Sequence, residues 1–109
     1  MNRAALAFAG ASAAVWVAGC APALPPATSQ DVDRVRTDRP WVTLEDLQRG
    51  RELFAQRCGA CHAVPDLDAH PASEWPRLVR WMQGRAKLDS TGARQVEDWI
   101  LSRKSAQAR

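Results

Sequence analysis

Between residues 41 and 104, apolar residues recur with the period of an α-helix in three segments. In the first segment, apolar or small residues follow at spacings of three or four positions, which places them on one helical face; they are Leu44, Leu47, Gly50 and Phe54. Thr43 precedes this pattern, and Asp46 stands at the third helical position, close to the capping box that begins many helices. The pattern predicts a helix that begins after Thr43 and ends near Cys58.

The other two segments show the same periodicity. The second has Ser73 as its expected N-cap and Gly84 as its expected end, and its apolar stripe is Trp75, Leu78, Val79 and Met82. The third has Asp89 as its expected N-cap, and its stripe is Ala93, Val96, Trp99 and Ile100. No segment alternates apolar and polar residues as a strand would. We therefore expect a small all-α domain of three helices.

The first twenty residues have the pattern of an export signal. Arg3 supplies a positive start, an apolar run covers residues 4–17, and the small residues Ala18 and Gly19 precede Cys20. The sequence VAGC resembles a bacterial lipobox, in which the cysteine becomes the lipidated first residue. We expect residues 1–19 to be a lipoprotein signal peptide and Cys20 to carry the lipid. An uncleaved membrane anchor and an unlipidated Cys20 are the alternatives.

Residues 20–40 lack an apolar period and are rich in proline, with Pro22, Pro25, Pro26 and Pro40. Such composition predicts a flexible, lipid-anchored linker. The folded domain is then expected to cover residues 41–109. A domain this small usually needs a disulfide, a metal or a cofactor to complete its core.

The charge pattern excludes one class of function. The 109 residues carry 15 Lys and Arg and 12 Asp and Glu, and acidic residues are interleaved throughout. A nucleic-acid-binding domain is expected to show a basic stripe instead. We therefore expect no nucleic-acid partner.

The segment Cys58-Gly59-Ala60-Cys61-His62 has the spacing of a haem c attachment motif. Two thiols at this spacing reach the two vinyl groups on one porphyrin edge. The histidine that follows is then held under the iron as its proximal ligand. The export signal agrees with this interpretation, because haem c is normally attached outside the cytoplasm.

Other interpretations of the two cysteines remain open. A thioredoxin-like redox pair would need a βαβ unit and a helix that starts at the first cysteine. A zinc site would need four ligands, and Cys58, Cys61, His62 and His70 make up that number. A disulfide between Cys58 and Cys61 is the simplest alternative in an oxidising compartment.

The sixth ligand of the iron is expected to be Met82. It is the only methionine after residues 1–19, and it lies on the apolar stripe of the second predicted helix. A lone methionine on such a stripe is ordinarily core, but here the core must contain a haem edge. His70 is a competing ligand, and a vacant sixth position is a further alternative.

Residues 41–104 resemble a small, single-haem, class I-type cytochrome c domain, as found in bacterial lipoproteins. The resemblance rests on the haem motif and on Pro65-Asp66, His70, Glu74-Trp75-Pro76, Val79, Met82, Leu88 and Trp99. It implies that the first and last helices of the domain cross at a contact between a glycine and aromatic residues. The matching positions are Gly50, Phe54 and Trp99, where Trp99 replaces the usual tyrosine.

The expected function is one-electron transfer through one covalent haem c, with iron cycling between the ferrous and ferric states. We expect no enzymatic activity, because no general acid or base is positioned for one. The expected location is the periplasmic side of a membrane, and the expected partners are an electron donor and an acceptor. A haem sensor or peroxidase-like protein with an open sixth site, or a non-haem thiol or zinc module, are the alternatives.

Several residues around Met82 carry charge or an aromatic ring. Trp81 lies off the apolar stripe and is expected to be partly exposed, packed against a loop rather than in a docking site. The nearby cations are expected to form a solvated face from which one or two residues contact haem propionates or an acidic partner; they are Arg77, Arg80, Arg85 and Lys87.

Overall fold

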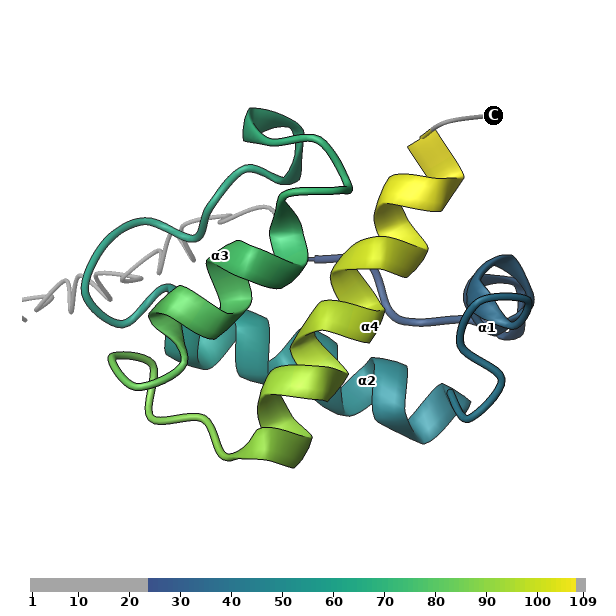
Figure 1. Cartoon of the computed structure of the whole chain (residues 1–109), viewed down its shortest axis with the longest axis horizontal. Helices are drawn as coiled ribbons and strands as arrows, with labels where there is room; N and C mark the ends of the chain where they lie inside the picture. Colours follow the sequence, from purple (N-terminus) through teal and green to yellow (C-terminus); the bar gives the residue numbers. More distant parts are fainter. Residues whose placement is uncertain (1–23, 108–109) are drawn as a thin grey trace, which may run out of the picture.

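The computed structural model describes residues 24–107, and their regular secondary structure is entirely helical (Figure 1). The prediction of an all-α fold is confirmed. The α-helices are α1 (Ser29–Val35), α2 (Leu44–Leu53), α3 (Trp75–Met82) and α4 (Ser90–Gln107). A π-helical turn over Phe54–Cys58 continues α2, and a 3-10 turn over Leu67–Ala69 precedes α3. The predicted signal peptide and Cys20 lie outside the described residues.

The beginning of α2 follows the prediction. The Thr43 hydroxyl accepts a hydrogen bond from the Asp46 amide at 3.1 Å, and the Asp46 carboxylate accepts one from the Thr43 amide at 3.2 Å. These two bonds form a complete capping box. Leu47 and Gly50 are buried as expected, but Leu44 is 45% exposed and lies outside the core. The chain stays helical to Cys58, so this helix leads directly into the cysteine motif.

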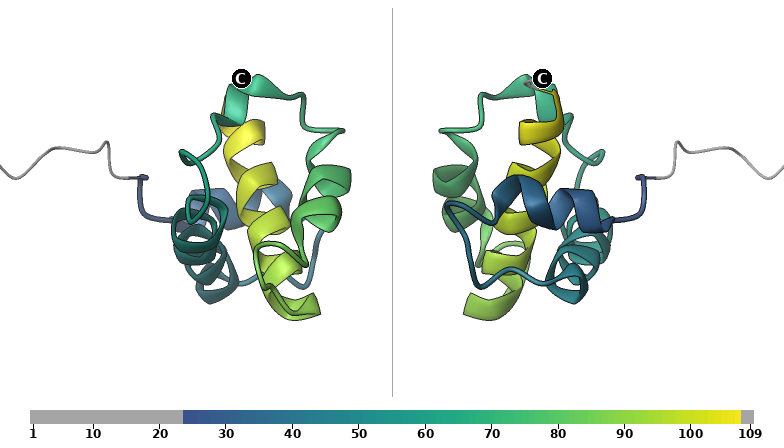
Figure 2. Two further views of the ribbon diagram at one scale, coloured as in Figure 1. Left: turned by 90° about the vertical axis from the view of Figure 1, so that its left-hand side faces the viewer. Right: turned by 90° about the vertical axis from the view of Figure 1, so that its right-hand side faces the viewer.

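Helix α4 lies at the centre of the domain, between α3 on one side and α1 and α2 on the other (Figure 2). Its predicted N-cap is confirmed, because the Asp89 carboxylate accepts a hydrogen bond from the Gly92 amide at 2.6 Å. Its predicted apolar face is also confirmed, since all four of its residues are buried: Ala93, Val96, Trp99 and Ile100. This helix therefore supplies the largest share of the core.

The predicted contact between glycine and aromatic residues is present where α2 crosses α4. The backbone carbonyl of Gln95 lies so close to Gly50 that a Cβ there would be 2.0 Å from its oxygen. Beside this point the rings of Phe54 and Trp99 pack with centroids 5.1 Å apart. Only glycine allows the two backbones to approach this closely.

The beginning of α3 differs from the prediction. Ser73 is not its N-cap: the Glu74 amide bonds to the Pro71 carbonyl at 3.0 Å, and this turn leads directly into the helix. Ser73 therefore lies inside the turn and is exposed. Gly84 lies directly after the end of the helix, as predicted, because α3 ends at Met82 and Gln83 is its C-cap. Gly84 itself has no positive φ.

The chain reverses at the end of the turn that follows Met82, at Lys87, whose φ of 52° lies in the left-handed region. The Leu88 amide bonds to the Gln83 carbonyl at 3.0 Å, and the Lys87 amide bonds to the Gly84 carbonyl at 3.2 Å. These two bonds are those of a Schellman motif, in which glycine is the preferred reversing residue. The backbone conformation of Lys87 is therefore energetically unfavourable, as it is for any residue that has a Cβ atom.

Replacing Lys87 by glycine is expected to stabilise the protein by about 0.5–1 kcal/mol, because relief of the left-handed strain exceeds the entropy that glycine loses on folding. Urea denaturation of the two proteins measures this difference. Lys87→Ala is the matched control, since it removes the same charge and keeps the Cβ. Equal stabilities for the glycine and alanine variants would contradict the strained conformation.

The prediction of a flexible linker over residues 20–40 is wrong for α1. Thr28 caps this helix with its own capping box, and Val32 and Val35 are buried in the core. Asp31 is fully buried, and its carboxylate accepts hydrogen bonds from Arg34 and, at 3.2 Å, from Arg103 of α4. Two valines one turn apart make too short a stripe to be recognised as a period. The burial of α1 comes from tertiary contacts that the local pattern does not show.

The folded domain begins before α1. The Arg51 side chain donates two hydrogen bonds to the Leu24 carbonyl, the longer one at 2.9 Å. The Ala27 amide donates to Gln48 at 3.2 Å, and both Leu24 and Ala27 pack against the core. Residues from Leu24 onward therefore belong to the folded domain, whereas Trp41 was the predicted first residue.

Asp46 links the beginning of α2 to α4. Its carboxylate accepts hydrogen bonds from Gln95 at 3.0 Å and from Arg94 at 3.2 Å, in addition to those from Thr43. Burial acts to raise the pKa of Asp46, but the hydrogen bonds from Gln95, Thr43 and Arg94 together outweigh it and lower the pKa below its ordinary value of 3.8. The ionised form is therefore favoured by folding.

The stabilising contribution of Asp46 is expected to be present above pH 3.8 and to disappear as the pH falls through its lower pKa in the folded state. At neutral pH, Asp46→Asn should cost about 1–2 kcal/mol. This cost should shrink steadily on acidification to about pH 3. Denaturant unfolding over this pH range measures it, and Asp33→Asn on the exposed face of α1 is the control. A cost for Asp46→Asn that does not change with pH would contradict the prediction.

Candidate functional site

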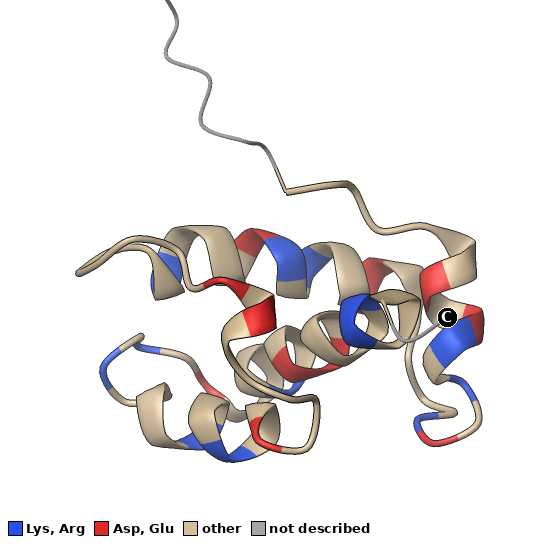
Figure 3. Ribbon diagram, turned by 90° about the horizontal axis from the view of Figure 1, so that it is seen from above, with Lys and Arg blue, Asp and Glu red and all other residues tan. Residues whose placement is uncertain are grey.

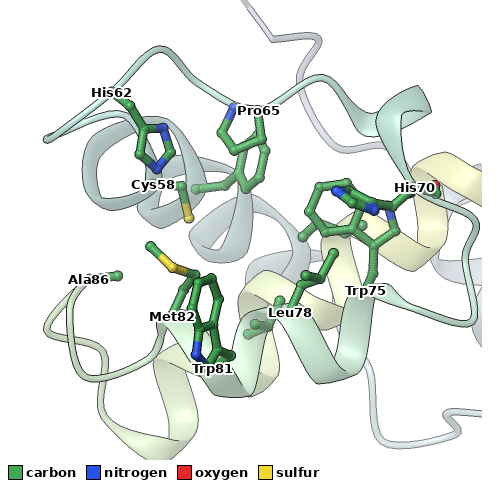
Figure 4. A pocket seen from close by; sticks show the side chains of 12 residues that line it. Cys58, His62, Pro65, His70, Trp75, Leu78, Trp81, Met82 and Ala86 are labelled. Atoms are coloured by element: carbon green, nitrogen blue, oxygen red, sulfur yellow. Dashed lines mark hydrogen bonds between the residues drawn. The ribbon is translucent and has the colours of Figure 1, made fainter.

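An apolar cleft of about 230 Å³ opens between the end of α2 and α3 (Figure 4). The π-helical turn supplies Phe54 and Cys58 to it, and the loop that follows supplies His62 and Pro65. The remaining lining comes from α3, the turn after it and α4: Trp75, Leu78, Val79, Trp81, Met82, Ala86 and Ile100. His70 also reaches the lining from the turn before α3. Segments between Phe54 and Ile100 therefore converge on this cleft.

Three of the four predicted site residues of the domain meet in the cleft. Cys58, His62 and Met82 all line it, and the sulfur atoms of Cys58 and Met82 point toward each other across it (Figure 4). Cys61 does not line the cleft and is exposed on the loop. The structure thus brings together both predicted iron ligands and one of the two thiols.

The loop that carries the motif folds back over the end of α2 at Gly59. A Cβ at this position would lie 2.7 Å from the Val64 side chain and 3.0 Å from the Ala55 carbonyl oxygen. A side chain here would therefore push the loop away from the helix. The glycine between the two cysteines allows His62 to return to the edge of the cleft.

His62 presents one ring nitrogen for binding. Its Nδ1 lies 2.7 Å from the carbonyl oxygen of Ala63. Because a carbonyl only accepts, Nδ1 carries a proton, which leaves Nε2 as the nitrogen that can bind a metal when the ring is neutral. A neutral imidazole held in this tautomer by a carbonyl is the usual form of a histidine that binds a metal.

The environment of Cys58 differs from that of the reactive thiol in a redox pair. Burial raises the pKa of its thiol above the ordinary value of 9.0. Reactive thiols in redox pairs have a lowered pKa, often at the N-terminus of a helix, whereas Cys58 ends one. Cys58 and Cys61 are both free thiols in the structure. This geometry differs from the one that the thioredoxin-like alternative requires.

The donors of the zinc alternative do not gather at one point. Among residues 24–107, no group of three His, Cys, Asp or Glu side chains lies close enough to hold one metal ion. The cleft instead combines thiol, imidazole and thioether groups with an apolar wall.

His70 is bound into the turn before α3. Its Nδ1 lies 3.0 Å from the Glu74 carboxylate, and its ring packs edge-on against Trp75 with centroids 5.7 Å apart. The Trp75 indole in turn donates to the carbonyls of Leu67 and His70, at 3.3 and 3.2 Å. In Figure 4 this cluster lies at the end of the cleft away from Met82.

The chain matches no protein-family model, no curated protein and no solved structure. Within residues 24–107, none of the helices has the length and apolar character needed to cross a membrane.

Proposed function

We propose that this protein is a one-electron carrier that binds one haem c. In this proposal, Cys58 and Cys61 would hold the porphyrin covalently, and His62 and Met82 would bind its iron. The observation that carries the proposal is the position of Cys58 and His62 of the Cys-x-x-Cys-His motif at an apolar cleft, with the Met82 thioether on the opposite side.

The residues of the cleft fit such a group. The His62 Nε2 lone pair is available as an iron ligand, and thioether sulfur is a known partner of histidine in electron-transfer haems. The wall formed by Phe54, Trp75 and Val79 is apolar, as the porphyrin faces require. Cys61 lies on an exposed loop without regular secondary structure, and attachment requires its thiol to turn toward the same edge of the cleft.

Each residue has a separate role in this proposal. The bound haem supplies the exchange of one electron between ferrous and ferric iron. The two thioether links prevent its loss, and His62 and Met82 hold the iron in one coordination state. The apolar wall excludes water and so disfavours the more highly charged ferric state. No proton transfer or substrate bond is involved, and the protein is proposed to have no enzymatic activity.

The proposal includes export and lipid attachment. Residues 1–19 are proposed to direct the chain across the inner membrane, where haem c is attached. Cys20 is proposed to carry the lipid that holds the protein on a membrane facing the periplasm. Its partners are then redox proteins that give and accept single electrons at that surface.

The direct test is expression in a bacterium that attaches haem c in its periplasm. The purified protein should give a pyridine haemochrome spectrum of the c type and one haem per chain. Its haem should stay on the polypeptide in a denaturing gel. The Cys58→Ala/Cys61→Ala variant should carry no covalent haem. A parent protein without haem, or a double variant that still holds it covalently, would refute the assignment.

A further inference from the structure

The positive charge of this protein is concentrated in one short segment. Residues 75–88 contain Arg77, Arg80, Arg85 and Lys87 and no acidic residue. The remaining 95 residues carry 11 Lys and Arg against 12 Asp and Glu. The segment consists of α3 and the turn after it, and Figure 3 shows blue without red along this part of the ribbon. The excess charge of the chain therefore lies on one element.

These four cations have no ion-pair partner among the described residues. All four are exposed, and none takes part in a salt bridge there. Most other described cations are paired with carboxylates: Arg34, Arg36, Arg39, Arg49, Arg94, Arg103 and Lys104. The donors on α3 and its turn are thus available to carboxylates from outside the molecule.

An exposed aromatic ring lies within this charged segment. Trp81 is 66% exposed, and the Arg85 guanidinium stacks over its ring at 4.8 Å from the centroid. Arg77 stands four positions before Trp81, on the same side of α3. Tryptophan and arginine are the residues most enriched at the energetic centres of protein interfaces. Trp81 also lines the cleft, so this surface borders the site (Figure 4).

We propose that Arg77, Arg80, Trp81, Arg85 and Lys87, the α3 face, form the docking site for an acidic protein surface. The partner is the redox protein that exchanges electrons with the cleft, and this second statement rests on the proposed function. A protein docked on the α3 face covers the rim of the cleft at Trp81. The distance from the partner to the redox centre proposed for the cleft is then short. Attraction between the cations of the α3 face and the acidic partner also speeds the association of the two proteins.

The composition of the α3 face favours a protein over a lipid surface. A helix that lies in a membrane interface inserts several large apolar side chains. The apolar stripe of α3 is used inside the domain, with Trp75 and Val79 buried in the core. Trp81 is then the one large apolar side chain that α3 exposes. One aromatic ring surrounded by cations suits a rigid acidic patch.

The first test measures binding to acidic groups without any redox step. The mature full-length protein, labelled with 15N, is titrated at low ionic strength with a short polyglutamate peptide. The Trp81 indole signal and the amides of residues 77–87 should shift. Arg80→Gln/Arg85→Gln should weaken binding about fivefold, and Trp81→Ala should weaken it as well. Arg36→Gln, which removes an exposed cation directly after α1, should bind as the parent does.

Absence of binding, or shifts that lie outside residues 75–88, would overturn the α3 face as a docking site. Vesicles that contain anionic lipid and a polylysine peptide are the two comparison probes. Polylysine should not bind. Binding to the vesicles without binding to polyglutamate would replace the proposed protein partner by a membrane surface.

The second test uses the reduced haem protein and two small oxidants of opposite charge. One electron passes from ferrous iron to hexacyanoferrate(III), which gives ferric iron and hexacyanoferrate(II). Arg80→Gln/Arg85→Gln should slow this reaction severalfold and leave the reaction with cationic hexaammineruthenium(III) unslowed. Equal effects on both reactions would show that the charge of the α3 face does not guide oxidants to the cleft, and would overturn its proposed role in electron exchange. A protein without haem would refute the proposed function alone, since polyglutamate binding is measured independently.

Discussion

Under the proposed haem assignment, replacing Met82 by alanine is expected to lower the reduction potential by on the order of 100 mV or more. The thioether favours ferrous iron, and its loss should also open the sixth position to water or carbon monoxide. Helix α3 should survive the change, because Trp75 and Val79 are buried in the core and Leu78 packs against it. Redox titration and the rate of carbon monoxide binding measure the two effects.

Two further variants separate Met82 from His70 as the ligand. Met82→His should give a low-spin centre with two histidine ligands, also at a lower potential. His70→Ala should leave the visible spectrum and the potential nearly unchanged, because its imidazole is engaged with Glu74 and Trp75. A high-spin His70 variant, together with Met82 variants that keep the parent spectrum, would make His70 the ligand. Rapid carbon monoxide binding by the parent would favour the sensor alternative.

Replacing Gly50 by alanine is expected to destabilise the fold by about 3 kcal/mol or more. The added Cβ would lie 2.0 Å from the Gln95 carbonyl oxygen, which is backbone of α4 and cannot turn aside. In a free helix the same change would stabilise, since alanine has the higher helix propensity. A loss of stability would therefore come from the clash where α2 crosses α4, and not from the helix propensity of α2 itself.

Gly84→Ala is the matched control for this prediction. No atom lies within 4 Å of a Cβ built at Gly84, and the residue has no positive φ. This variant should be as stable as the parent or more stable by about 0.5–1 kcal/mol. Urea denaturation followed by circular dichroism compares the two. Similar stabilities for Gly50→Ala and Gly84→Ala would show that α2 and α4 do not pack at Gly50.

The elements that were predictable from sequence are those whose signals are local. Thr43 and Asp89 lie directly before their helices, and both capping interactions are present. The contact of Gly50 with Trp99 followed from the resemblance to class I-type cytochromes. Helix α1 was not predictable, because its buried carboxylate Asp31 is paired with Arg103, which lies 72 residues further along the chain.

The residues of the candidate site also fall into two groups, those with a local sequence signal and those that only the fold brings together. Cys58 and His62 are recognisable because the motif is contiguous, and Met82 because it follows the stripe of α3. The walls contributed by Ala86 and Ile100 come together only through the fold. The pairing of His70 with Glu74 was not predicted, because His70 is extended and the contact forms only through the turn before α3. The outward position of Cys61 depends on the loop path and had no sequence signal.

The hydrogen bonds from Arg51 to the Leu24 carbonyl limit the distance between the folded domain and Cys20. Four Cα-to-Cα steps separate Cys20 from Leu24, which is roughly 14 Å when fully extended. The linker first expected from the composition would instead have allowed excursions of about 25 Å. A lipid on Cys20, as proposed, would keep the domain against the bilayer surface and limit its turning there. Electron exchange would then favour partners that reach the cleft at the height of the lipid headgroups.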